Sequence, residues 1–302
     1  MKKYFLITIA SFAMMLASCQ TNTTLENNVV TTLFPQYSIA RHLLDGIADV
    51  TFLLEAGQSP HDFEPTPSQV VSLNRAKAVF YTSEIVEPWI HNVEDTARGQ
   101  LIDLSSNITL LEGHEDHETS LEDDHDHGDE DPHYWIDPAN ALLMLTTISE
   151  TLIELFPEEE VILRSREETL RTGLSEVVTA YEDLLDPDQE LDIVFAGHNA
   201  FGYLETYGIH VLSPYAGFSD DVLPTAQSLA DFVTQMEELN TLILYVSSTD
   251  NQTIIEALIA ALDGIETVEI FAIASVPRSL DLSTVTYEEM LMLNLEAIAE
   301  SL

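Results

Sequence analysis

The stretch "PEEEVILRSREETLRTGLSEVVTAYEDLLDP", residues 157–187, decides the fold that we expect. It begins with a proline, which suits the first position of a helix, and then places glutamates in the first turn, where the helix dipole favours acidic side chains. Apolar residues follow in steps of seven, four and three, which keeps one helical face apolar: Leu163, Leu170, Leu174, Val177, Tyr181 and Leu184. The pattern stops at Asp186-Pro187, and its length predicts a rigid spine between two lobes.

Short apolar or β-branched runs alternate with helical patterns on both sides of this spine, which indicates parallel strands joined by crossover helices. Before the spine, the pattern predicts strands at 29–34, 50–54 and 79–81 and helices at 37–44, 68–77 and 138–155. After it, the pattern predicts strands at 191–196, 209–213, 241–246 and 268–271 and helices at 201–207, 224–239, 253–262 and 287–299.

The sequence therefore predicts an α/β fold of two lobes with parallel-type sheets and crossover helices, joined by a long rigid linker helix. Ligands bind in crevices at the carboxyl ends of parallel strands, so we expect the functional site in the cleft between the lobes.

The first 18 residues have the organisation of an export signal. Lys2 and Lys3 precede a short apolar run that ends in a Leu-Ala-Ser sequence, and this run is too short for a transmembrane helix. Cys19 comes next, and the four residues resemble the bacterial lipobox, in which the cysteine is lipidated and becomes the mature N-terminus. The alternative is a stray thiol at an ordinary cleavage site.

We expect the mature protein to lie outside the cytoplasm, anchored by its lipid to the bacterial cell membrane. The predicted division of the chain is a signal peptide (1–18), the lipidated cysteine with a flexible tether (19–28), an N-terminal α/β lobe (29–156) that includes a mobile loop rich in His and acids (113–131), the linker helix (157–187) and a C-terminal α/β lobe (188–302).

The composition excludes several classes of ligand. Ten Lys and Arg residues against 53 Asp and Glu residues give a formal charge of −43 with His neutral, which repels phosphate backbones and anionic lipid headgroups. We therefore expect no binding to nucleic acid. Since Cys19 is the single cysteine, neither an intrachain disulfide nor a thiolate-rich metal site is expected, and any metal must be held by nitrogen and oxygen.

Three histidines stand where the chain leaves regular structure: His61 in "GQSPHDFEP", His133 in "DPHYWIDP" and His198 in "VFAGHNAFGYL". Glycine or proline precedes each one, which places each ring at a turn that can point into a cleft. Taken singly, each is more often an ordinary polar or core histidine. Together, in a chain without thiolate pairs, they are suitable ligands for a nitrogen-rich zinc site.

These motifs, with "GQSPHDFEPTPSQ", "DPHYWIDPANA" and "GHNAFGYLETYGI" in that order, resemble those of the zinc and manganese solute-binding lipoproteins of bacterial metal ABC transporters. The resemblance runs from about residue 29 to the end, and the loop before "DPHYWIDP" is similar to that of the zinc-specific branch. It implies one metal between two lobes, with His61 and His133 from the N-terminal lobe and His198 from the C-terminal lobe. It also implies a membrane permease and an ATPase as partners, and we expect a monomer.

The expected cargo is Zn²⁺, and Mn²⁺ is the alternative within the same transport class. The resemblance implies that manganese-selective members carry a glutamate at the position of His198, and a third imidazole favours zinc because manganese prefers oxygen ligands. The resemblance also implies an acidic fourth ligand after a late strand, but that position reads Ile273 or a neighbour. Water, Asp281 or Glu205 remain open as the fourth ligand.

Residues 113–131 contain 4 histidines and 10 acids without Lys or Arg, a composition that does not bury a core. We hypothesise auxiliary capture of zinc by this loop and transfer to the site of His133, the capturing residues being His114, His117, His125 and His127. The alternative is a solvated acidic loop with incidental histidines.

Two rival functions come from other classes. Three histidines plus water also form a catalytic zinc site, but a hydrolase needs a general base and the chain has no H-E-x-x-H pairing. Surface adhesion, a role sometimes assigned to the family, has no support in the sequence.

We further expect Asp62 and Asp137 to orient ligand rings, with a helix cap as the alternative for Asp137. We expect Trp89 and Trp135 to pack in the core.

Overall fold

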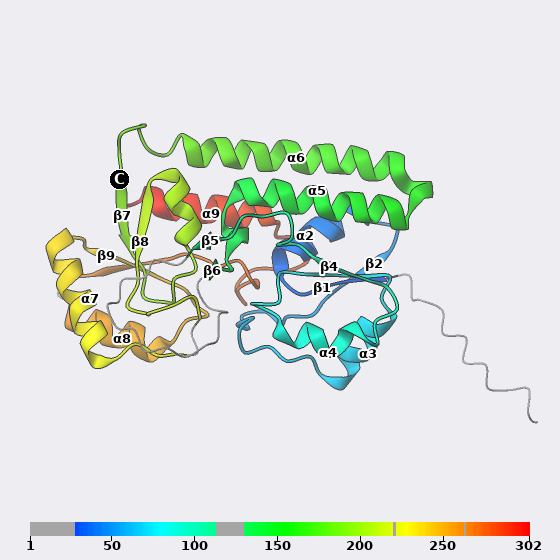
Figure 1. The fold of residues 1–302 in the computed structure, drawn as a ribbon. Coiled ribbons are helices and arrows are strands. Elements are labelled where there is room, and N and C mark those ends of the chain that lie inside the picture. The colour runs from blue at the N-terminus through cyan, green and yellow to red at the C-terminus, as the bar shows by residue number, and fades with distance from the viewer. Residues whose placement is uncertain (1–27, 113–129, 220–221, 263) are drawn as a thin grey trace, which may run out of the picture.

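The computed structural model describes residues 28–112, 130–219, 222–262 and 264–302. The predicted export signal and Cys19 lie outside the described residues, and so do His114, His117, His125 and His127. The described chain forms two α/β lobes side by side, with a layer of long helices that runs along both of them (Figure 1).

The N-terminal lobe is built on a four-stranded sheet in the order β2-β1-β3-β4, with every neighbouring pair parallel. The central strands β1 and β3 are completely buried, as expected for a parallel sheet covered on both faces. The strands are β1 (Asn28–Thr31), β2 (Asp49–Phe52), β3 (Ala78–Tyr81) and β4 (Gln100–Asp103). The helices of this lobe are α2 (Phe34–Leu43), α3 (Pro67–Arg75), the 3₁₀ helix η1 (Pro88–Ile90) and α4 (His91–Glu94).

Strand β1 ends at Thr31, three residues before the predicted end at residue 34. The apolar run continues, but the chain turns into helix α2 at Phe34, and the Oε1 of Gln36 accepts the N–H groups of Thr32 and Leu33 at this turn, both at 3.0 Å. Pro35 then suits the first turn of α2. The sequence pattern also missed β4, η1 and α4, which are short and have no sustained period.

The C-terminal lobe contains two parallel pairs of strands, β7 with β8 and β9 with β10, and a parallel bridge between Phe195 and Tyr245 links the pairs. The strands are β7 (Leu191–Val194), β8 (Ile209–Leu212), β9 (Ile243–Val246) and β10 (Glu266–Glu269). The helices are α7 (Ala226–Leu239), α8 (Gln252–Ala261) and the 3₁₀ helix η4 (Gly202–Tyr207), for which the sequence predicted an ordinary helix.

A layer of helices joins the lobes. It consists of α5 (Pro138–Leu155), the 3₁₀ turn η3 (Pro157–Glu159), α6 (Glu160–Glu182) and α9 (Tyr287–Ala299). Figure 1 shows α5 and α6 lying side by side, with α9 next to them. The spine α6 buries the predicted face, and at its end the Tyr181 hydroxyl donates to the Leu291 carbonyl of α9 at 2.9 Å. Among the described helices, no single one combines the length and the hydropathy that a membrane span requires.

After β10 the chain returns to the N-terminal lobe, and we call residues 270–286 the return segment. Its backbone carbonyls accept hydrogen bonds from three separate parts of that lobe, so the two lobes contact each other through this segment. The bonds run from Trp135 Nε1 to Ala272 O (2.7 Å), from Phe34 N to Ala274 O (2.9 Å) and from Gly57 N to Val276 O (3.1 Å).

A buried carboxylate organises the ends of β1 and β3. Glu87 is 1% exposed, and its carboxylate accepts the N–H groups of Thr82 and Ser83 and the hydroxyl of Thr32. The Thr82 carbonyl in turn accepts the Tyr134 hydroxyl at 2.9 Å, which positions the segment next to His133. Burial raises the pKa of Glu87 to about 7 in spite of these donors.

Replacing Glu87 with Gln should change how stability depends on pH. Folding raises the pKa of Glu87 from 4.5 to about 7, so between these pH values the folded protein holds a proton that the unfolded chain releases. The contribution of Glu87 to the free energy of unfolding is therefore greatest in acid and falls as pH rises from 4.5 to 7. The free energy of unfolding of the unmodified protein, relative to Glu87→Gln, should therefore fall by roughly 1 to 3 kcal/mol over this range. Urea denaturation at several pH values measures it, with the exposed Glu94→Gln as control. Parallel pH profiles for the unmodified protein and Glu87→Gln would contradict this assignment.

Candidate metal centre

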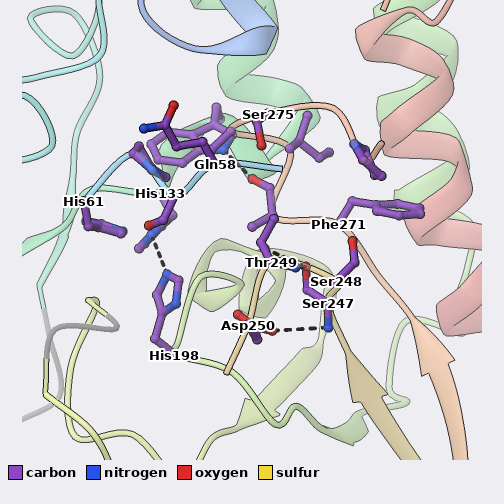
Figure 2. A pocket seen from close by; sticks show the side chains of 17 residues that line it. Gln58, His61, His133, His198, Ser247, Ser248, Thr249, Asp250, Phe271 and Ser275 are labelled. Carbon is purple, nitrogen blue, oxygen red and sulfur yellow. Dashed lines mark hydrogen bonds between the residues drawn. The ribbon is translucent and has the colours of Figure 1, made fainter. Parts of the chain in front are cut away.

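The three histidines that the sequence singled out lie together around one cavity, although 65 residues separate His133 from His198 and more separate His61 from either. Figure 2 shows their rings pointing toward one another, with Ser247, Thr249 and Asp250 of the C-terminal lobe also around the pocket. The carboxyl ends of β2 and β7 supply His61 and His198, as expected for a site in parallel α/β sheets.

His61 lies in the loop after β2. Gly57, with φ of 74°, makes the turn that a residue with a side chain rarely adopts. A second turn follows, because Phe63 N donates to the Pro60 carbonyl at 3.2 Å. Phe63 is buried against Trp89 with ring centroids 5.8 Å apart, and this contact anchors the loop that holds His61.

His133 is 1% exposed and follows a short antiparallel pair formed by β5 (Leu111–Glu112) and β6 (Glu130–Asp131). The carboxylate of Asp131 accepts twice from it: its Oδ1 lies 2.9 Å from His133 N and 2.8 Å from His133 Nδ1. Since Nδ1 donates its proton to a carboxylate, Nε2 keeps its lone pair and faces the cavity. Asp131 thus prepares His133 to ligate a cation.

Asp131 is the functional residue that the sequence reading missed, because we assigned it to the mobile acidic loop. It is 1% exposed, and its backbone carbonyl accepts the Tyr203 hydroxyl at 3.0 Å. A Cβ at Gly202 would lie 2.7 Å from Asp131 Oδ2, so η4 of the C-terminal lobe packs directly on this carboxylate. The available signal was its position two residues before His133, where an aspartate caps a turn.

His198 lies four residues after the end of β7, and between them Ala196 N donates to the Tyr245 carbonyl at 2.9 Å. Ser213 fixes the turn, because its hydroxyl donates to the Gly197 carbonyl at 2.6 Å. The imidazole is 7% exposed, and its Nε2 lies 3.3 Å from the Nε2 of His133. Burial, and then the neighbouring His133 and His61, hold the pKa of His198 well below its usual range, which keeps it neutral and able to ligate.

The geometry of the cluster suits a tetrahedral cation. One nitrogen from each of His61, His133 and His198 lies within 4.8 Å of the others, and the ring centroids are 5.2 to 5.5 Å apart. Ligand nitrogens about 2.0–2.1 Å from Zn²⁺ in tetrahedral geometry are roughly 3.3 Å apart, which is the separation between His133 and His198. The cluster offers three imidazoles and no thiolate. Zinc binds imidazole nitrogen readily, whereas manganese prefers oxygen ligands.

The acids considered for a fourth ligand lie elsewhere. Glu205 is exposed on η4, and Asp281 is exposed in a turn where it accepts the N–H and hydroxyl of Ser283 at 2.9 and 2.7 Å. Those hydrogen bonds hold the pKa of Asp281 below its usual range. Ile273 does line the cavity, at 1% exposure, and its φ of 58° is unusual for a β-branched residue.

Of the two acids expected to orient ligand rings, Asp62 is exposed to solvent. Asp137 is the N-cap of α5, where it accepts the N–H of Ala139 at 2.8 Å and the hydroxyl of Tyr207 at 2.6 Å. The alternative reading of Asp137 as a helix cap is therefore the one that the structure shows. Burial, partly offset by these hydrogen bonds, raises its pKa. Trp89 and Trp135 are buried in the core, and Trp135 also borders the cavity.

Several solved structures share this fold. The Zn(II)-bound ZnuA-like domain of Streptococcus pneumoniae AdcA superposes with a TM-score of 0.73 at 24% identity, covering 91% of this chain and 98% of that one. The metal-dependent lipoprotein YcdH of Bacillus subtilis gives 0.74 at 24% identity, covering 92% and 99%. The laminin-binding protein Lmb of Streptococcus agalactiae, described as an adhesin and metal transporter, gives 0.77 at 21% identity, covering 91% and 99%. At these identities the comparison shows the fold, which this chain shares with these three proteins over more than nine tenths of its length.

The family itself follows from the sequence comparison. The model of the family described as zinc-uptake complex component A, periplasmic, matches residues 29–301, and the chain belongs to that family. The high-affinity zinc uptake system protein ZnuA of Bacillus subtilis is 25% identical over 311 residues, which cover 98% of this chain and 97% of that protein. The zinc-binding lipoprotein AdcA of Streptococcus pneumoniae R6 is 27% identical over 270 residues, which cover 85% of this chain but 53% of AdcA. The chain thus spans about half the length of AdcA.

These comparisons confirm the predicted fold class and the predicted family. The family consists of transport binding proteins for zinc and not of enzymes, so the hydrolase alternative is dropped. The boundaries predicted for the lobes and the assignment of the three histidines as ligands stay predictions.

Removing the carboxylate of Asp131 should weaken metal binding without removing a ligand. In Asp131→Asn the amide no longer fixes the protonation of His133 Nδ1, and loss of such a partner typically lowers metal affinity by about 10- to 100-fold. Zinc affinity, measured by competition with a chromophoric chelator, should fall by this factor. The neighbouring Glu130, which is exposed, provides the matched control Glu130→Gln, for which we expect no change. Equal affinities in Asp131→Asn and the unmodified protein would refute the role of Asp131.

Proposed function

We propose that this chain binds one Zn²⁺ between its lobes through His61, His133 and His198 and delivers it to the membrane permease of an ATP-driven importer. The observation that carries the proposal is the convergence of three buried or half-buried imidazoles, brought from three separate loops, in a chain of the zinc-uptake family. The two most similar relatives described above are named for zinc uptake and zinc binding.

The ligand set favours zinc over manganese in this chain. The three clustered imidazoles present nitrogen, and the stretch where an acidic ligand was expected, at Ile273 or a neighbour, lines the cavity without an acid. Manganese in proteins prefers carboxylate, carbonyl and water oxygens, whereas nitrogen sites rank zinc well above manganese. We therefore propose zinc as the physiological cargo.

Release of the cargo follows from the origin of the ligands. His61 and His133 come from the N-terminal half of the chain, and His198 from the C-terminal lobe. A separation of the lobes that withdraws His198 leaves Zn²⁺ with two imidazoles, which bind it far less tightly than three. Docking on a permease that favours the separated arrangement would thus transfer the ion without any change in protonation.

Calorimetric titration tests this function. Zinc, and then manganese, is titrated into metal-free protein comprising residues 28–302 and into His198→Ala. We expect one tight zinc site that is lost in His198→Ala, because two imidazoles remain, and much weaker binding of manganese. The matched control is His210→Ala, since His210 is on β8 of the same lobe and its side chain is 42% exposed next to Glu190.

Tight manganese binding, or zinc binding that does not depend on His198, would contradict the proposed site. The same titration with a variant that lacks residues 113–129 examines the proposed auxiliary capture by His114, His117, His125 and His127. We expect weaker zinc sites to disappear and the tight one to stay. Support for this role is the composition of the loop and the β5–β6 pair, which brings its ends together two residues before His133.

We also propose that the protein is held at the outer face of the cell membrane by a lipid on Cys19. The support is the Leu-Ala-Ser-Cys sequence after the apolar run, and the name of the relative AdcA as a lipoprotein. In Cys19→Ser the anchor cannot form, so the protein should move from the membrane fraction to the soluble fraction, as measured by fractionation and blotting. Ser18→Ala keeps a small residue before Cys19 and should stay in the membrane fraction. Membrane retention of Cys19→Ser would disprove lipid anchoring.

A further inference from the structure

The proposed cargo has two positive charges, whereas three neutral imidazoles supply none to balance them. A buried charge is costly unless opposite charge lies near it. On the N-terminal side the balance comes from Asp131, which contacts His133 directly. The inference below rests on the proposed function and concerns the second negative charge.

His198 has no counterpart of Asp131 on its own ring. Its Nδ1 is buried and has no hydrogen-bond partner among the residues that the structure describes. The acid expected from the return segment is absent as well, because Ile273 occupies that part of the wall. The negative charge on the C-terminal side must therefore come from another loop.

Asp250 is the single acidic residue among the described residues that line the cavity. It lies in the loop between β9 and α8, where Asp250 N donates to the Ser247 carbonyl at 3.1 Å and its Oδ2 accepts the Ser247 N–H at 3.2 Å. These two bonds close a turn that holds the carboxylate at the cavity wall (Figure 2).

A second feature places Asp250 against Gly197, the residue before His198 in the chain. A Cβ at Gly197 would lie 2.4 Å from Asp250 Oδ2 and 2.6 Å from Oδ1, so both carboxylate oxygens face the Cα of the residue that precedes His198. A side chain at position 197 would therefore displace the Asp250 carboxylate, which closely approaches the backbone of Gly197.

We propose that Asp250 is a specificity-determining residue of the metal centre, which supplies from the C-terminal lobe the second negative charge that a divalent cargo needs. The carboxylate oxygens of Asp250 do not belong to the cluster of ligand nitrogens from His61, His133 and His198, which lie within 4.8 Å of one another. Asp250 therefore acts through its charge and not as a fourth ligand. The negative charges of Asp131 and Asp250 together balance the two positive charges of a dication. A monovalent ion such as Cu⁺ balances only one of them.

Asp250→Asn tests this role, because the amide keeps the shape and an oxygen for the Ser247 N–H and removes only the charge. Removing one negative charge near a dication lowers the Coulomb attraction between the ion and the site, and we expect the affinity for Zn²⁺ to fall by roughly 10-fold. Since the Coulomb energy is proportional to the charge of the ion, the logarithm of the loss for Cu⁺ should be about half as large. Competition with chelators for Zn²⁺ and for Cu⁺ measures both constants.

The matched control is Asp192→Asn, which removes the same charge from an exposed position on β7 of the same lobe and should bind both ions normally. Gly197→Ala gives a second route, because the added methyl displaces the Asp250 carboxylate and should also weaken zinc binding. Thermal unfolding of the metal-free variants verifies that they are folded.

Normal zinc binding by Asp250→Asn would overturn the inference and leave the proposed function intact. Equal losses for Zn²⁺ and Cu⁺ would overturn it too, because they would indicate a change of shape instead of charge. Failure of the unmodified protein to bind zinc would instead reject the proposed function on which the inference rests.

Discussion

The Nε2 atoms of His133 and His198 face each other at 3.3 Å across the boundary between the two lobes. Two imidazole nitrogens at this separation are favourable only if a cation joins them or if one donates a proton to the other. Asp131 accepts a hydrogen bond from Nδ1 of His133, and burial keeps His198 neutral, so the lone pairs are available to a cation. The rest of the architecture maintains this separation.

Three features of the fold maintain it. The spine α6 packs on α5 and α9, which together span both lobes. The return segment ties the C-terminal lobe to the N-terminal one through backbone carbonyls, next to the cavity wall formed by Ile273. The Tyr203 hydroxyl contacts the Asp131 carbonyl and accepts the N–H of Leu111 at 3.1 Å, so that η4 is fixed to the base of the β5–β6 pair. Small movements of one lobe therefore act directly on the ligands.

Much of the fold was predictable because its signals are periodic. The face of α6, the alternation of strands and helices, and the turns before His61, His133 and His198 follow from local chemistry. The end of β1 was wrong because helix α2 already begins at Phe34, and the Gln36 side chain accepts the N–H groups just before it, which no apolar pattern records. Asp131 and Asp250 were missed for a different reason: among 53 acids, composition cannot distinguish a carboxylate buried by tertiary contacts from a solvated one.

The most direct test of the account is anomalous diffraction at the zinc absorption edge from crystals of the protein grown with one equivalent of Zn²⁺. We predict a single strong peak about 2.0–2.1 Å from one nitrogen of each of His61, His133 and His198. A principal peak at another position, such as the exposed group of Glu84, His91 and Glu94 on the N-terminal lobe, would contradict the claim that one zinc ion joins the two lobes.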